Sequence, residues 1–144
     1  AGTLAAIEHI AWIGRKVGGE ELPRRESIRA AFKAIETHEE GLCWRIIEGL
    51  MDIEGVRIWG VTDSDRMKER APTISFTHPS KTASEIADAL AEHGIFAWAG
   101  NFYALELSEA LCLEPEGALR IGVLHYNTMS ETERFLSAVR SILG

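Results

Sequence analysis

The sequence predicts an α+β fold, in which helices pack on one face of a small, mostly antiparallel sheet. Two long segments with helical spacing open the chain, and short segments of alternating apolar and polar residues follow them. Further helical segments separate these short strands, and there are no repeats or low-complexity tracts. Strands interleaved with helices in this way are typical of an α+β layer. Hydrophobic residues make up 46% of the 144 residues, enough for a core without disulfides or metals.

Two helices are expected before the first strand. Residues 3–17 carry apolar residues at helical spacing, with Thr3 as the expected N-cap. Gly18-Gly19 interrupts this pattern, and a second helix is expected over residues 24–51. The apolar stripe of the second helix consists of Ile28, Ala31, Phe32, Ile35, Leu42, Ile46, Ile47 and Leu50.

Four short strands are expected after these helices. Residues 73–77 and 118–124 alternate apolar and polar side chains, as a strand with one solvated face does. Residues 56–60 and 95–98 are shorter apolar segments that are also interpreted as strands. Residues 101–113 are expected to form a short helix or an ordered loop.

Capping signals mark the two later helices. Thr82 and Glu85 form a capping box at the start of the first, and Gly94 is expected just past its end. Thr128 and Glu131 form a second capping box, which opens the final helix.

Composition argues against several classes of partner. The formal net charge is -7, whereas phosphate contacts need clustered Lys and Arg, so a nucleic-acid partner is not expected. A membrane span is not expected either, because no stretch approaches the ~18 consecutive apolar residues that one needs. Cys43 and Cys112 lie in apolar helical patterns and form no CxxC pair, and Cys112 is expected in the core. Two lone thiols suit a reducing cytoplasm.

Motifs of catalysis and metal binding are absent from the sequence. His38-Glu39-Glu40-Gly41-Leu42 begins like a zinc-protease helix, but Leu42 stands where the second histidine belongs. The phosphate-loop patterns GxGxxG and GxxxxGK and the nucleophile pattern GxSxG are missing as well. No metal site is expected.

Arg120 is the most informative single residue. Leu119, Ile121 and Val123 flank it in the last strand, where alternation turns Arg120 to the face opposite the core. A half-buried guanidinium needs a partner, and the local pattern leaves two open. One is a carboxylate of the chain such as Glu106, and the other is a substrate carboxylate held through two parallel hydrogen bonds.

The chain also resembles a known family. The segments RAPTISFT, GIFAWAGNFYA and GALRIGVLHYNT, with the amphipathic helix after them, resemble the C-terminal domain of class V aminotransferases, in particular the cysteine-desulfurase-like branch. The most specific pieces in this order are Arg70-x-Pro72-Thr73, Gly94-Ile95, Gly100, Arg120 and Tyr126-Asn127-Thr128.

This resemblance implies fold type I, a homodimer and pyridoxal phosphate held mainly by a larger domain. Residues 1–18 then resemble the helix that connects that missing domain, and residues 19–144 the C-terminal small domain. The start at Ala1, without methionine and within a helical pattern, also favours a piece of a larger enzyme. By matched position, Arg120 is expected to pair with the α-carboxylate of an amino-acid substrate and Asn101 to contact the substrate. Tyr103 and His125 are expected at the edge of the active site.

Two departures from the family pattern limit the expected chemistry. Tyr103 stands where cysteine desulfurases carry a catalytic cysteine, and a phenol cannot accept sulfur as a persulfide, which needs a thiolate. None of the four lysines, Lys16, Lys33, Lys68 and Lys81, lies in a context that resembles the cofactor lysine. The chain alone is therefore expected to be inactive and not to bind the cofactor. Two alternatives stay open: a free-standing α+β ligand-binding module, and a dimerisation domain that uses helix 24–51.

Overall fold

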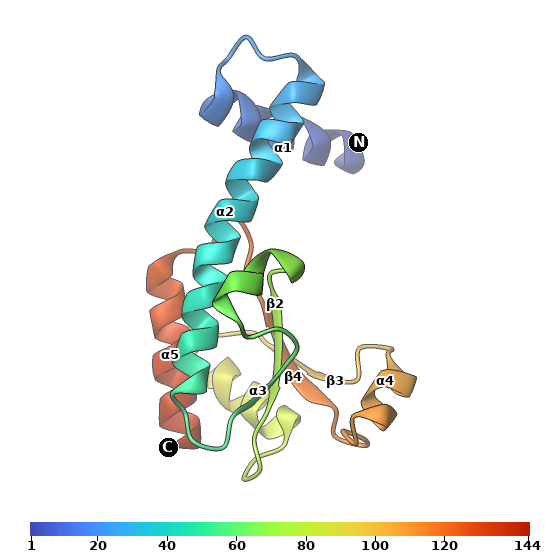
Figure 1. Ribbon diagram of the computed structural model, residues 1–144, viewed down its shortest axis with the longest axis vertical. Coiled ribbons are helices and arrows are strands. Elements are labelled where there is room, and N and C mark those ends of the chain that lie inside the picture. The colour runs from blue at the N-terminus through green and yellow to red at the C-terminus, as the bar shows by residue number, and fades with distance from the viewer. The chain divides into compact units, whose positions relative to one another are not determined.

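The computed structural model describes residues 1–144 and contains the predicted mixture of helices and one four-stranded sheet. In chain order its elements are α1 (Gly2–Gly18), α2 (Arg24–Met51), β1 (Arg57–Trp59), the 3-10 helix η1 (Ser64–Glu69), β2 (Thr73–Thr77), α3 (Ala83–Glu92), β3 (Trp98–Gly100), α4 (Leu105–Ala110), β4 (Ala118–Gly122) and α5 (Met129–Leu143) (Figure 1). The chain divides within α2 into two compact units, Ala1–Gly41 and Leu42–Gly144. The α+β fold class is confirmed.

The first unit consists of α1 and the first part of α2. Gly14 of α1 has no room for a side chain, because a Cβ there would lie 1.7 Å from the carbonyl oxygen of Ser27 on α2. The two helix backbones thus touch at this glycine. The expected N-cap at Thr3 is wrong: α1 begins at Gly2 after Ala1, and no side chain caps it. Thr3 therefore lies inside the first turn.

All four strands of the second unit pair antiparallel, in the order β1-β2-β4-β3. The strand pairs set the register, with Ser75 of β2 opposite both Trp59 of β1 and Arg120 of β4, and Arg120 opposite Trp98 of β3. These four residues therefore form one row across the sheet.

The core of the second unit lies on one face of this sheet. The part of α2 from Leu42 onward, α3 and α5 supply its helical side, while α4 contributes no buried residue to it. The largest fully buried side chains of the core are Phe76, Ile47, Leu50, Ile74, Ile86, Leu90, Leu119, Leu136 and Val139. The predicted stripe of α2 is confirmed at Leu42, Ile46, Ile47 and Leu50, which are buried, but Phe32 is exposed.

The ends of α3 form as the sequence predicts. Because of its C-terminal end, the next strand begins later than predicted. Thr82 and Glu85 make the capping box. At the other end, Gly94 takes a positive φ of 66°, and the Ile95 N–H donates to the carbonyl of Leu90 at 3.0 Å, which completes a Schellman motif. This bond uses the Ile95 N–H, so β3 begins at Trp98 and not at residue 95 as predicted.

The final helix is anchored to α2. Thr128 and Glu131 form the predicted capping box of α5. Arg45 of α2 donates two hydrogen bonds to Glu133 of α5, at 2.6 and 2.9 Å, and the bonded carboxylate raises the pKa of the Arg45 guanidinium.

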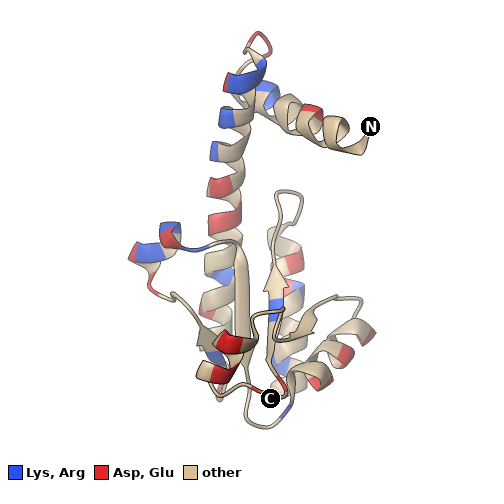
Figure 2. Ribbon diagram, turned by 90° about the vertical axis from the view of Figure 1, so that its right-hand side faces the viewer, with Lys and Arg blue, Asp and Glu red and all other residues tan.

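Charges of both signs share the helix surfaces. Figure 2 shows basic residues in the first turns of α2 and acidic residues in the turns that follow. The charged residues of α4 are all acidic. No helix combines the length and the apolar composition needed to cross a membrane.

Candidate functional site

The row Trp59, Ser75, Arg120 and Trp98 lies on the face of the sheet opposite the core. Its neighbours along the strands, Phe76 and Leu119, are fully buried on the other face, because successive side chains of a strand point to opposite sides. The prediction that Arg120 turns away from the core is therefore confirmed. In this row one cation lies between aromatic residues on the two edge strands.

Aromatic rings, and not a carboxylate, surround the Arg120 guanidinium. Its Cζ lies 4.1 Å from the centre of the Phe102 ring and 5.8 Å from that of Trp98. The ion pairs of the chain join Lys16 to Glu20, Arg24 to Glu8, Arg45 to Glu133 and Arg66 to Glu69. A pair between Arg120 and Glu106, one of the two partners that the sequence left open, does not form.

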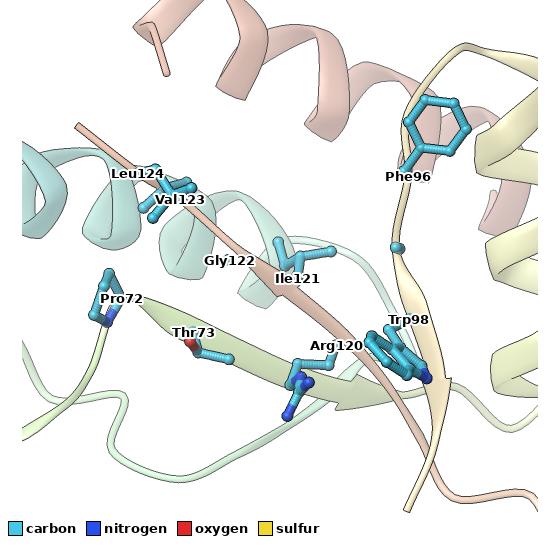
Figure 3. A pocket seen from close by; sticks show the side chains of 10 residues that line it. Pro72, Thr73, Phe96, Trp98, Arg120, Ile121, Gly122, Val123 and Leu124 are labelled. Atoms are coloured by element: carbon cyan, nitrogen blue, oxygen red, sulfur yellow. The ribbon is translucent and has the colours of Figure 1, made fainter. Parts of the chain in front are cut away.

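A cavity of about 620 Å³ opens beside Arg120. Pro72 and Thr73 of the β2 side, Phe96 and Trp98 of the β3 side, and residues 120–124 line it. Figure 3 shows Arg120 between Thr73 and Trp98. Arg120 is the only charged residue of this lining, so the cavity combines an apolar wall with a single guanidinium.

A second cavity, of about 360 Å³, has Phe102 in its lining. Trp59 and Ser75 of the same row line it together with Asn101, Phe102 and several residues of the α4 region. Arg120 lines the first cavity and Phe102 lines the second, and these two side chains contact each other.

The loop after β3 has an unusual backbone. Phe102 and Tyr103 both have positive φ angles, 57° and 62°, a region that bulky residues rarely adopt. Asn101 bridges this loop: its Oδ1 accepts a hydrogen bond from the Tyr103 N–H at 3.2 Å, and its Nδ2 donates to Glu114 at 3.2 Å. The Tyr103 side chain is 96% exposed.

His125 lies apart from these two cavities, since it lines neither of them. It is half-buried after β4, and its ring meets that of Tyr126 edge-on at 5.2 Å. The structure therefore brings Arg120, Asn101 and the Tyr103 backbone into one region around Phe102, whereas His125 lies outside the lining of either cavity. Sequence reasoning missed Phe102 and Trp98, although Trp98 already stood in an expected strand.

Cys112 is exposed, and the expectation that it packs in the core is wrong. It follows α4 with a φ of 57°, and the next residue, Leu113, donates its N–H back to Ser108 at 2.8 Å. Cys112 therefore occupies the left-handed position of a helix C-terminus, which turns its side chain off the helical face. Cys43, by contrast, is buried. No group of three or more His, Cys, Asp or Glu side chains is placed to hold a metal ion.

The family Aminotransferase class-V matches residues 26–135. The chain belongs to the class V aminotransferases. This matched range includes Arg120, both cavities and the strained loop.

Relatives of known sequence agree with this assignment. Aminotransferase-like protein FGM3 of Gibberella zeae is 30% identical over 121 residues, which are 82% of this chain and 30% of that protein. Probable cysteine desulfurase 2 of Mycobacterium leprae is 33% identical over 108 residues, which are 75% of this chain and 25% of that protein. This class V chain thus spans less than a third of the length of either relative.

Solved structures of cysteine desulfurases share the fold. The enzyme from Thermococcus onnurineus NA1 superposes with a TM-score of 0.72 at 28% identity, over 83% of this chain and 28% of that chain. The cysteine desulfurase CsdA from Escherichia coli gives 0.64 at 25% identity, over 82% of this chain and 29% of that chain.

The lysines of this class V chain lie outside the candidate site. All four are exposed, and none lines the cavities beside Arg120 and Phe102. The linings of these two cavities therefore offer no amine to a pyridoxal phosphate group.

Proposed function

We propose that this chain is the C-terminal part of a pyridoxal-phosphate enzyme that acts on an amino acid, and that Arg120 binds the substrate α-carboxylate. The observation that carries the proposal is the guanidinium of Arg120, which has no acidic partner in the chain and faces a cavity of about 620 Å³. A planar guanidinium offers paired N–H donors that match the two oxygens of a carboxylate. Class V aminotransferases and cysteine desulfurases depend on pyridoxal phosphate and take small amino-acid substrates, which supports this role.

Asn101 and Tyr103 contribute to the same substrate site, and His125 marks its outer edge. Both ends of the Asn101 amide already bond to the chain, one to the Tyr103 N–H and the other to Glu114, so Asn101 acts mainly by shaping the wall that meets the substrate. The exposed Tyr103 phenol faces outward from that wall. Because a phenol forms no persulfide, the proposed reaction does not transfer sulfur through this position.

The cofactor belongs, in this proposal, to a larger domain of the same protein. The relatives are three to four times longer than the segment they share with this chain, which leaves room for such a domain. Residues 1–18 connect the two parts, and the working enzyme is a homodimer. Two cysteines without a disulfide support a reducing compartment such as the cytoplasm.

The test uses the longer protein that contains this chain. It should be yellow, and borohydride should bleach the colour; a colourless protein would contradict the proposal. Amino acids should be screened as substrates, with the decarboxylated amine of each as a control that lacks the group Arg120 binds.

Arg120→Gln should raise the KM for the amino-acid substrate, because the carboxylate loses its charged partner. The apparent binding free energy of the substrate should weaken by roughly 2–4 kcal/mol. Arg120→Lys keeps the charge but not the paired donors and should recover only part of that loss. Steady-state kinetics of both variants measure this. An unchanged KM in Arg120→Gln would remove Arg120 from the site.

A further inference from the structure

The aromatic contact of Arg120 holds the guanidinium without using its N–H donors. A cation over a ring face is attracted by the electrons of the ring, and the N–H groups at the edge of the guanidinium stay available. At 4.1 Å, Phe102 is the nearer of the two rings. The direction in which Arg120 presents its donors therefore depends on where the Phe102 ring lies.

The position of Phe102 depends in turn on an unfavourable backbone. Two consecutive aromatic residues, Phe102 and Tyr103, adopt left-handed φ angles. Each such residue costs on the order of 1–3 kcal/mol and persists only where the surroundings hold it.

Glu114 is the anchor of the loop. Its Oε1 accepts a hydrogen bond from Asn101 Nδ2 at 3.2 Å and another from the hydroxyl of Ser108, a buried residue of α4. The other end of the Asn101 amide accepts from the Tyr103 N–H at 3.2 Å, and the Ala104 N–H donates to the Asn101 carbonyl at 2.9 Å. One half-buried carboxylate thus fixes the residue that bridges both left-handed positions.

We propose that Glu114 and Phe102 are positioning residues for Arg120. Glu114 holds Asn101, Asn101 holds the left-handed loop, and the loop sets the Phe102 ring against the guanidinium. This inference rests on the proposed role of Arg120 for its consequence, carboxylate binding, but its geometric part is independent of that role.

The geometric test is NMR of the Arg120 Nε–Hε group in the 15N-labelled chain of 144 residues. A ring face at this distance shields the guanidinium protons, so the wild-type Hε signal should lie upfield, and Phe102→Leu should abolish the shift. Glu114→Ala should abolish it as well, although Glu114 does not touch Arg120. Glu114→Gln retains an acceptor for Asn101 and should keep most of the shift.

Two matched variants control for general effects. Phe32→Leu removes an exposed phenylalanine of α2, and Glu116→Ala removes an exposed carboxylate two residues beyond Glu114. Both should leave the Arg120 Hε signal in place. An unchanged Hε shift in Glu114→Ala overturns the inference, and this variant decides the matter even if Phe102→Leu does not fold.

Titration of the longer protein that contains this chain with L-alanine, and with ethylamine as the probe without a carboxylate, tests the consequence. Phe102→Leu and Glu114→Ala should weaken L-alanine binding at Arg120 by about two- to tenfold and leave ethylamine unaffected. If both variants bind L-alanine as the wild type does, the positioning role is overturned. If the wild-type Arg120 signal ignores L-alanine while the ring shift behaves as expected, the proposed carboxylate role fails and the positioning of Arg120 stands.

Discussion

Gly117 and Gly94 share a left-handed backbone, with φ angles of 68° and 66°, but differ in their surroundings. A Cβ on Gly117 would lie 2.2 Å from the carbonyl carbon of Gly100, whereas a Cβ on Gly94 would meet open space. Gly94→Ala should therefore lose only about 1–2 kcal/mol of unfolding free energy, the cost of the backbone conformation. Gly117→Ala should lose at least about 2 kcal/mol more, because the backbone of Gly100 must move.

Urea unfolding of the two variants measures this difference. Equal losses would show that Gly117 and Gly100 do not need their close approach. Since Gly100 directly precedes the strained loop, Gly117→Ala should also shift the NMR signals of residues 101–104, which Gly94→Ala should leave unchanged.

At the scale of single residues, the sequence predicted the strand position of Arg120 but not its surroundings. Alternation along β4 was enough to place its side chain opposite the core. The contact of Phe102 with Arg120 was not predictable. It depends on left-handed backbone angles at Phe102 and Tyr103, where the sequence has no glycine to indicate them. The burial of Cys112 was predicted wrongly for the same reason. Cys112 takes a left-handed position at the end of α4 that is usually filled by glycine.

At the scale of elements, local chemistry was a better guide than apolar pattern. Both capping boxes formed at the predicted residues, because each needs only a side chain and a backbone three residues away. The third strand was misplaced by three residues, because apolar spacing does not show that the Ile95 N–H is already bonded to the end of α3.

The capping box of α5 should make stability depend on pH. The backbone N–H of Thr128, and next its hydroxyl, donate to Glu131 and lower the pKa of that carboxyl. Between the lowered value and the ordinary value, the unfolded chain binds more protons than the folded one, so stability rises with pH there. The stabilisation is complete above the ordinary pKa of glutamate and is lost as the pH falls through the lowered value.

Glu131→Gln removes this titration. The variant should be less stable than the wild type at pH 7, and the gap should narrow steadily as the pH falls below the ordinary pKa of glutamate, measured by thermal unfolding followed by circular dichroism. Glu85→Gln should behave alike, because the Thr82 N–H and hydroxyl lower the pKa of Glu85 in the same way. A gap that stays constant from pH 7 to pH 3 would contradict this account.

At the scale of the whole molecule, the site and the core both belong to the second unit. Arg120, Phe102, Trp98 and both cavities lie after Leu42, and so does every residue of the hydrophobic core cluster. The sequence did not predict this division, because the helical pattern of α2 runs without interruption through the boundary at Gly41. A helix can be continuous across a boundary that the core does not cross. The extent of the core, and not that of the helix, sets which residues unfold together as one cooperative unit.

It follows that residues 42–144 should fold without residues 1–41. The shortened chain should unfold in urea as one cooperative transition, with a free energy that matches the longer chain within the ~10–15% uncertainty of the extrapolation. Trp44, Trp59 and Trp98 report on this unit, so the comparison should use the longer chain with Trp12→Phe, which carries the same three fluorophores. A broad, non-cooperative transition or a clearly lower free energy would mean that residues 1–41 help to stabilise the unit that carries Arg120.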